Sequence, residues 1–356
     1  MGSFEEPAPS LFMFKCFACL GRFFTGLYCP FPKFASEFKM NVVISDDYQD
    51  CVKTLDCFSK LKDHQVTIYN DTVKDVNALV QRYKDADAIV LTRERTSITK
   101  ELLERLPNLK LISQTGKINY HVDVQACASQ GVMVCDGSGS GACTVELNLL
   151  LILASLRNLV PEVERLKSGL WQGTLGRQLS GKTVGVLGFG RLGSQLSHFV
   201  KALGAKPLVW GRESTLEKAR AQGFEVASSR EEFFKTCDIL TLQLRLIPAT
   251  LHYVKAKDLA LMKSDSILVN VSRAELIEPG ALYAGLKMGR PGFAAVDVYE
   301  QEPVLGAQDP LISLPNCLCS PHLGFVEKDN YEVYYGTAFD NINAFAAGNP
   351  QNVVKV

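Results

Sequence analysis

The sequence predicts an α/β protein built from two parallel sheets, each covered by helices. Short apolar runs alternate with segments of helical spacing along most of the 356 residues. The glycine-rich turn 137–141 divides this alternation into two blocks, and a G-x-G-x-x-G motif follows a strand-like run in the second block. The length allows two domains.

The first block runs from about Met40 to Gly141. Its apolar residues recur at helical spacing over Val76–Tyr83 and Lys100–Leu106. The strands expected between these helices are 41–45, 66–69, 88–92, 109–113 and 132–134. Because strands that alternate with helices form parallel sheets, this block predicts one α/β unit.

The second block opens with an apolar helix expected over Thr144–Leu159, with Thr144 as its N-cap, and a shorter helix that starts at Pro161. The strands expected after these helices are 183–187, 207–210, 225–227, 239–242, 266–270, 293–298 and 317–320. The last helix, Asp329–Ala347, follows all of these strands. We therefore expect it to pack on the first unit, so that the second unit is inserted into the first.

The composition is that of a globular protein, with 47% hydrophobic and 21% charged residues and a net charge of zero. Zero net charge argues against a nucleic-acid partner, and no apolar run is long enough to span a membrane. The eleven cysteines, including the close pairs Cys16/Cys19 and Cys317/Cys319, lack the spacing of a metal site. We therefore expect a soluble, cytoplasmic protein with reduced thiols and no metal.

The leader, residues 1–39, is rich in aromatic residues and cysteine. Glu5 and Glu6 stand where a signal peptide would be positively charged. A disordered extension is the favoured interpretation, and adsorption to a membrane is the alternative.

The motif Gly188-Phe189-Gly190-Arg191-Leu192-Gly193 lies between an expected strand and an expected helix. In that context the glycines allow a tight turn and a close approach of the backbone to a pyrophosphate, whose charge the helix N-terminus stabilises. No carboxylate ends the next strand, where Gly211 and Arg212 stand. Arg212 suits a 2′-phosphate, which favours NADP. Glu213 keeps NAD as an alternative if its side chain turns inward.

Three further segments, 270–273, 297–303 and 320–324, follow three expected strands and should meet at the carboxyl edge of the sheet. Arg273 is permanently charged and can hold a carboxylate and polarise a ketone. His322 can donate a proton near neutral pH, and a neighbouring carboxylate, Glu302, would keep it charged. These residues predict hydride transfer between a nicotinamide dinucleotide and a small 2-keto or 2-hydroxy acid.

The strings G-F-G-R-L-G, N-V-S-R, D-V-Y-E-Q-E-P and S-P-H-L-G, in this order, resemble the D-isomer-specific 2-hydroxyacid dehydrogenase family from about Met40 to the C-terminus. The resemblance implies a flavodoxin-like substrate domain, 40–143 and 325–356, with an inserted Rossmann domain, 144–324. It also implies D stereochemistry and a homodimer formed through the helix after Gly141.

By the same resemblance, Arg273 binds the substrate, His322 and Glu302 are the acid/base pair, and backbone amides around Gly116 hold the substrate carboxylate. The residues expected to bind the dinucleotide are Gly188, Gly190, Arg191, Leu192, Gly193, Arg212, Val271 and Asp297, with Asp297 near the nicotinamide carboxamide. Ala274 and Gly211 depart from the usual glycine and acidic residue of the family.

Arg95 is expected to contact an acidic substrate tail, and Arg93 is a weaker candidate. The alternative for both is a surface loop with a salt bridge through Glu94. Phosphoglycerate, glyoxylate/hydroxypyruvate and formate dehydrogenases of the same superfamily are rival functions, although the absence of a further domain after Val356 argues against the longer phosphoglycerate enzymes. A dinucleotide-sensing, corepressor-like binding protein is the rival from another class.

Overall fold

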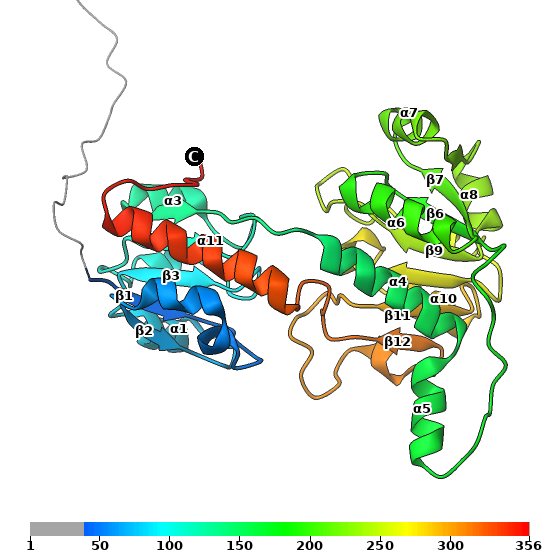
Figure 1. The fold of residues 1–356 in the computed structure, drawn as a ribbon, viewed down its shortest axis with the longest axis horizontal. Helices are drawn as coiled ribbons and strands as arrows, with labels where there is room; N and C mark the ends of the chain where they lie inside the picture. Colours follow the sequence, from blue (N-terminus) through cyan, green and yellow to red (C-terminus); the bar gives the residue numbers. More distant parts are fainter. Residues whose placement is uncertain (1–38, 356) are drawn as a thin grey trace, which may run out of the picture.

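The computed structural model describes residues 39–355 and contains two parallel sheets in two lobes (Figure 1). The first sheet has five strands in the order β2-β1-β3-β4-β5, and the second has seven in the order β12-β11-β10-β9-β6-β7-β8. The predicted α/β class is therefore confirmed. The expectations for the leader and for Cys16/Cys19 lie outside the described residues, apart from residue 39.

The first sheet is covered by helices on both faces, which is why β3 and β4 are buried along their whole lengths. Its strands are β1 Asn41–Ile44, β2 Gln65–Ile68, β3 Ala88–Leu91, β4 Leu111–Gln114 and β5 Met133–Cys135. Its helices are α1 Val76–Tyr83, α2 Lys100–Leu103, α3 Val124–Ser129 and the 3-10 turns η1 Val52–Thr54 and η2 Asp56–Leu61.

The second sheet places β6 between β9 and β7, beside the central strand β9. Its strands are β6 Thr183–Leu187, β7 Lys206–Trp210, β8 Glu225–Val226, β9 Ile239–Leu242, β10 Ile267–Asn270, β11 Phe293–Val296 and β12 Cys317–Cys319. Its helices are α6 Arg191–Ala202, α7 Glu213–Ala221, α8 Arg230–Thr236, α9 Ala256–Leu259, α10 Ala281–Lys287, with η3 Ala274–Leu276 and η4 Pro310–Ser313.

The last helix, α11 Lys328–Ala346, returns to the first sheet, as expected (Figure 1). Tyr335 and Phe339 are buried in one apolar cluster with Val42 and Val90 from β1 and β3. The Ser113 hydroxyl donates a hydrogen bond to the carbonyl of Ala338 at 3.0 Å. The chain therefore crosses between the lobes twice, once before α4 and once before α11.

The helix α4 spans Ala142–Leu156 and begins earlier than the sequence predicted. Gly141, with φ of 73°, is its N-cap, because glycine enters the left-handed region without steric cost. The prediction of Thr144 as the N-cap was wrong. The Thr144 hydroxyl instead donates a hydrogen bond to the carbonyl of Gly324 at 2.7 Å. This bond links the two segments in which the chain passes between the lobes.

The helix α5, Leu159–Lys167, starts two residues before Pro161. Within residues 39–355, no single helix is long and apolar enough to cross a bilayer. The helices α4 and α5 pass that test only as a pair, with a bend of 62° between them.

Candidate active site

The carboxyl ends of the second sheet face the loops of the first, and the cleft between them has a volume of about 610 Å³. The glycine-rich motif lies at this edge, between β6 and α6. An added Cβ on Gly193 would lie 2.2 Å from the carbonyl oxygen of Gly188, so only glycine packs there. An added Cβ on Gly190 would have no atom within 4 Å, so this glycine leaves open space beside the cleft. The α6 N-terminus has no side-chain cap, so its amide groups are free for a phosphate.

The eight residues expected to bind the dinucleotide divide into four groups, of which Asp297 alone is the last. Gly190, Arg191, Leu192 and Val271 line the cleft. Gly188 and Gly193 shape the turn behind it.

Arg212, in the third group, is exposed at the start of α7 and has no ion pair within residues 39–355. Its neighbour Glu213 accepts a hydrogen bond from Arg220 at 2.8 Å and so turns along its own helix.

Asp297 is fully buried at the end of β11. Its carboxylate accepts hydrogen bonds from the Ser320 hydroxyl at 2.6 Å, from the Leu323 amide at 2.7 Å and from the Gly324 amide at 2.8 Å. Burial raises its pKa. In this structure Asp297 fixes the loop that carries His322, a role that the motif alone did not indicate.

The three predicted catalytic residues line one cavity of about 160 Å³. His322 Nδ1 and Glu302 Oε2 are 2.6 Å apart, and the other Glu302 oxygen accepts from the Tyr299 amide at 3.0 Å. Arg273 lines the same cavity and donates to its neighbour's carbonyl, Ser272 O, at 2.7 Å. The strand ends therefore bring together the groups that the sequence predicted to meet.

Sequence reasoning missed the role of Arg95, whose Nη1 donates to Glu302 Oε2. Arg95 is only 8% exposed. The alternative of a surface loop with a salt bridge through Glu94 was therefore wrong, because Glu94 pairs with Arg273 instead, at 2.9 Å. Spacing could not reveal these pairs, because 207 and 179 residues separate the partners.

The pKa values of Glu302 and His322 are both lowered from their ordinary values. Burial raises the pKa of Glu302, but His322 and Arg95 outweigh it and lower the value to about 2. The pKa of His322 is lowered, first by burial and then by the charges of Arg95 and Arg273, although Glu302 raises it. Glu302 therefore favours the protonated form of His322, as expected. Its effect on the His322 pKa is smaller than the combined effect of burial, Arg95 and Arg273.

The expected carboxylate-binding loop lines the cleft through Gly116, Lys117, Ile118 and Asn119. A Cβ on Gly116 would lie 2.0 Å from Arg93 Nη1, so the glycine makes room for that guanidinium. Arg93 itself has a φ of 55°, the left-handed conformation that residues other than glycine rarely adopt. Its proximity to Gly116 was not predicted.

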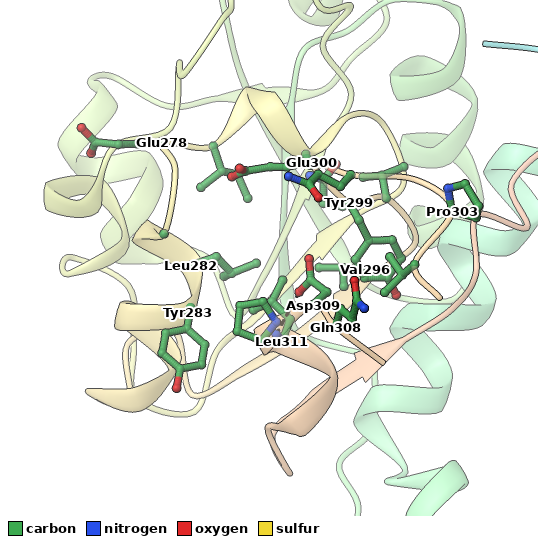
Figure 2. Close-up of a pocket in the computed structure, with 18 of the residues that line it drawn as sticks. Glu278, Leu282, Tyr283, Val296, Tyr299, Glu300, Pro303, Gln308, Asp309 and Leu311 are labelled. Carbon is green, nitrogen blue, oxygen red and sulfur yellow. Dashed lines mark hydrogen bonds between the residues drawn. The ribbon is translucent and has the colours of Figure 1, made fainter. Parts of the chain in front are cut away.

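Another cavity, of about 350 Å³, lies behind the loop that carries Glu302, and Figure 2 shows it between α10 and the 299–311 segment. Tyr283, Glu300 and Gln308 are among its lining residues, whereas none of the three predicted catalytic residues lines it. Among residues 39–355, no group of three or more side chains is arranged to hold a metal ion.

Comparison with known proteins identifies the family. Residues 149–324 match the D-isomer specific 2-hydroxyacid dehydrogenase, NAD binding domain. A glyoxylate reductase of Thermococcus litoralis is 32% identical over 78% of this chain and 86% of its own length. The chain belongs to the D-isomer specific 2-hydroxyacid dehydrogenase family. It therefore carries an NAD-binding domain and is an NAD(P)-dependent 2-hydroxyacid dehydrogenase, acting on a CH–OH group.

Other relatives show the breadth of this dehydrogenase family. A D-3-phosphoglycerate dehydrogenase of Methanocaldococcus jannaschii is 36% identical over 69% of this chain, which spans only 47% of that protein. A phosphoglycerate oxidoreductase structure from Vibrio cholerae O395 is 48% identical, with a TM-score of 0.85 over 87% of this chain and 99% of that one. A pyruvate reductase of Chlamydomonas reinhardtii is 26% identical, with a TM-score of 0.76 over 88% and 98%.

Proposed function

We propose that this dehydrogenase reduces a small 2-keto acid to the D-2-hydroxy acid with His322 as the proton donor. The observation that carries the proposal is the His322–Glu302 pair, 2.6 Å apart, in one cavity with Arg273. Family membership supports the D stereochemistry. It also supports the division into a substrate domain, 40–143 and 325–356, and an inserted dinucleotide domain, 144–324.

The proposed mechanism assigns one task to each of these residues. Arg273 and the backbone amides around Gly116 bind the substrate carboxylate, and the Arg273 guanidinium polarises the ketone. When bound, the dinucleotide supplies the hydride. His322 gives its proton to the ketone oxygen through Nε2, because Nδ1 is held by Glu302.

We propose NADP as the preferred dinucleotide. Arg212 is free of ion pairs within the described residues and lies at the start of α7, where a 2′-phosphate would meet it. Glu213, the residue that would favour NAD, is directed to Arg220. The expected dinucleotide residues belong to this proposal: Gly188, Gly190, Arg191, Leu192, Gly193, Arg212, Val271 and Asp297.

We also propose a homodimer formed through α4 and α5. Leucine side chains are exposed on α4, and leucine and valine side chains are exposed on α5, which is unusual for helices that face only water. The exposed apolar residues of α4, α5 and the following loop are Leu150, Leu153, Leu159, Val160, Val163, Leu166, Leu170, Trp171 and Leu175.

The test is a panel of 2-keto acids assayed with NADH and NADPH, followed by His322→Gln. The variant is expected to lose turnover and to bind the dinucleotide as tightly as the unchanged chain, because the side chain acts only on the substrate. His198→Gln, which changes an exposed histidine, is the control. Full activity in His322→Gln would overturn the acid/base assignment. Tight dinucleotide binding without turnover of any 2-keto acid would instead favour the dinucleotide sensor.

A further inference from the structure

The cavity that holds the proposed acid/base pair is lined by charges of both signs. Its charged lining consists of three arginines and four glutamates, Arg93, Arg95, Arg273, Glu94, Glu275, Glu300 and Glu302. Protonation of His322 makes the two signs equal in number. The lining therefore has no surplus of positive charge with which to hold a substrate that carries two negative groups.

Two of the arginines are already committed to partners. Arg95 donates to Glu302, and the side chains of this pair are 9% and 16% exposed. Arg273, the proposed carboxylate ligand, donates to Glu94, with side chains 25% and 18% exposed. Because Glu94 accepts from Arg273 Nη2, a carboxylate that binds this edge of the guanidinium has to displace that side chain.

The third arginine, Arg93, has no ion pair within residues 39–355. Its guanidinium lies 5.5 Å and 5.2 Å from the ring centres of Phe325 and Tyr334. Burial opposes ionisation of Glu94, yet Arg273 and then Arg93 lower its pKa. Glu94 therefore lies within the electrostatic reach of both arginines and has a second partner available.

We propose that this site selects 2-keto acids whose only negative charge is the carboxylate, and that Glu94 enforces the selection. The inference rests on the proposed reductase function. The substrate carboxylate takes the place of Glu94 on Arg273, and the displaced Glu94 carboxylate pairs with Arg93. Arg93 is then no longer available for a phosphate or second carboxylate on the substrate.

The energetic reason is the cost of an unpaired charge beside other negative charges in a partly buried cavity. A second anion would find Arg93, Arg95 and Arg273 all occupied, and it would lie beside the glutamates of the lining. Juxtaposed like charges discriminate strongly between otherwise similar ligands. The expected preference for the singly charged substrate is about tenfold or more in kcat/KM.

The experiment compares two substrates that differ only by a phosphate, hydroxypyruvate and 3-phosphohydroxypyruvate. The unchanged chain is expected to prefer hydroxypyruvate. Glu94→Gln is expected to shift the ratio toward the phosphorylated substrate by about tenfold, because it releases Arg93 and Arg273 together. It is also expected to lower KM for hydroxypyruvate, since the competitor for Arg273 has been removed.

Glu275→Gln is the matched control, because it removes a negative charge from the same cavity without releasing an arginine. It is expected to shift the ratio by less than about threefold. Equal or better use of 3-phosphohydroxypyruvate by the unchanged chain would overturn the inference. A Glu94→Gln variant with an unchanged ratio would overturn the role of Glu94.

A failure of the proposed function would look different, because the unchanged chain would then reduce neither substrate. In that case, calorimetric binding of the two acids to the complex with oxidised dinucleotide still measures the charge preference. Tighter binding of hydroxypyruvate supports the inference, and tighter binding of its phosphate overturns it.

Discussion

Arg95 and His322 share one carboxylate oxygen, Oε2 of Glu302, although they come from different lobes. The positive charge of Arg95 stabilises ionised Glu302 and opposes protonation of His322. The acid/base pair is therefore a three-residue charge network. The proton affinity of its histidine depends on a residue from the first sheet.

Replacing Arg95 by methionine is expected to raise the pKa of His322. Reduction needs protonated His322, so kcat/KM should fall as pH rises through a pKa that lies below the ordinary value of about 6.5. In Arg95→Met this descending limb should move to higher pH, while Arg95→Lys, which keeps the charge, should move it much less. The measurement is the pH profile of reduction. An unmoved limb with a raised KM would assign Arg95 to the substrate tail instead.

Replacing Arg212 by alanine is expected to weaken NADPH binding about tenfold or more and to leave NADH binding nearly unchanged, because only NADPH carries the 2′-phosphate. Dissociation constants from dinucleotide fluorescence measure both effects. Lys218→Ala, which removes an exposed cation from the same helix, is the control and should change neither constant by much. Equal losses for the two dinucleotides would mean that Arg212 contacts a shared part of the cofactor.

Replacing Asp297 by alanine is expected to lower the free energy of unfolding by about 3 kcal/mol or more, because three donors lose their acceptor in a buried site. Chemical denaturation measures the loss. Asp340→Ala removes an exposed ion pair with Lys60 and should cost less than about 1 kcal/mol. A similar small loss in Asp297→Ala would show that its hydrogen bonds are easily replaced by water.

Replacing Leu166 by glutamate is expected to convert the proposed dimer to a monomer. Leu166 is 60% exposed on α5, and a charge there would have to be buried in the interface. Sedimentation velocity measures the mass in solution. Met288→Glu, at an exposed apolar position on another face, should leave the mass unchanged. A monomeric unchanged chain would contradict the proposal directly.

The sequence predicted most elements because apolar periodicity reports burial on a sheet or helix face. Val76–Tyr83 and Thr183–Leu187 have the same bounds in the structure as in the prediction. Boundaries set by glycine conformation were harder to place, as the start of α4 at Gly141 shows. A threonine before an apolar run resembles an N-cap even when its hydroxyl binds another segment.

The meeting of Arg273, Glu302 and His322 could be predicted, because each follows a strand of one parallel sheet. Glu94 and Arg95 could not be placed in the same way, since they follow β3 of the other sheet. Their partners depend on how the two lobes face one another, and no local spacing encodes that geometry. The net direction of the His322 pKa was missed for the same reason.

The hydrogen bond between Thr144 and Gly324 ties together the only two chain crossings among the described residues. A rotation of one lobe against the other that keeps this hydrogen bond would turn about the contact as a pivot. His322 lies two residues from the pivot and would move through a short arc. Loops farther from the pivot would move through longer arcs. A small twist at Gly324 would therefore change the width of the cleft mouth, while His322, the proposed proton donor, would stay nearly in place.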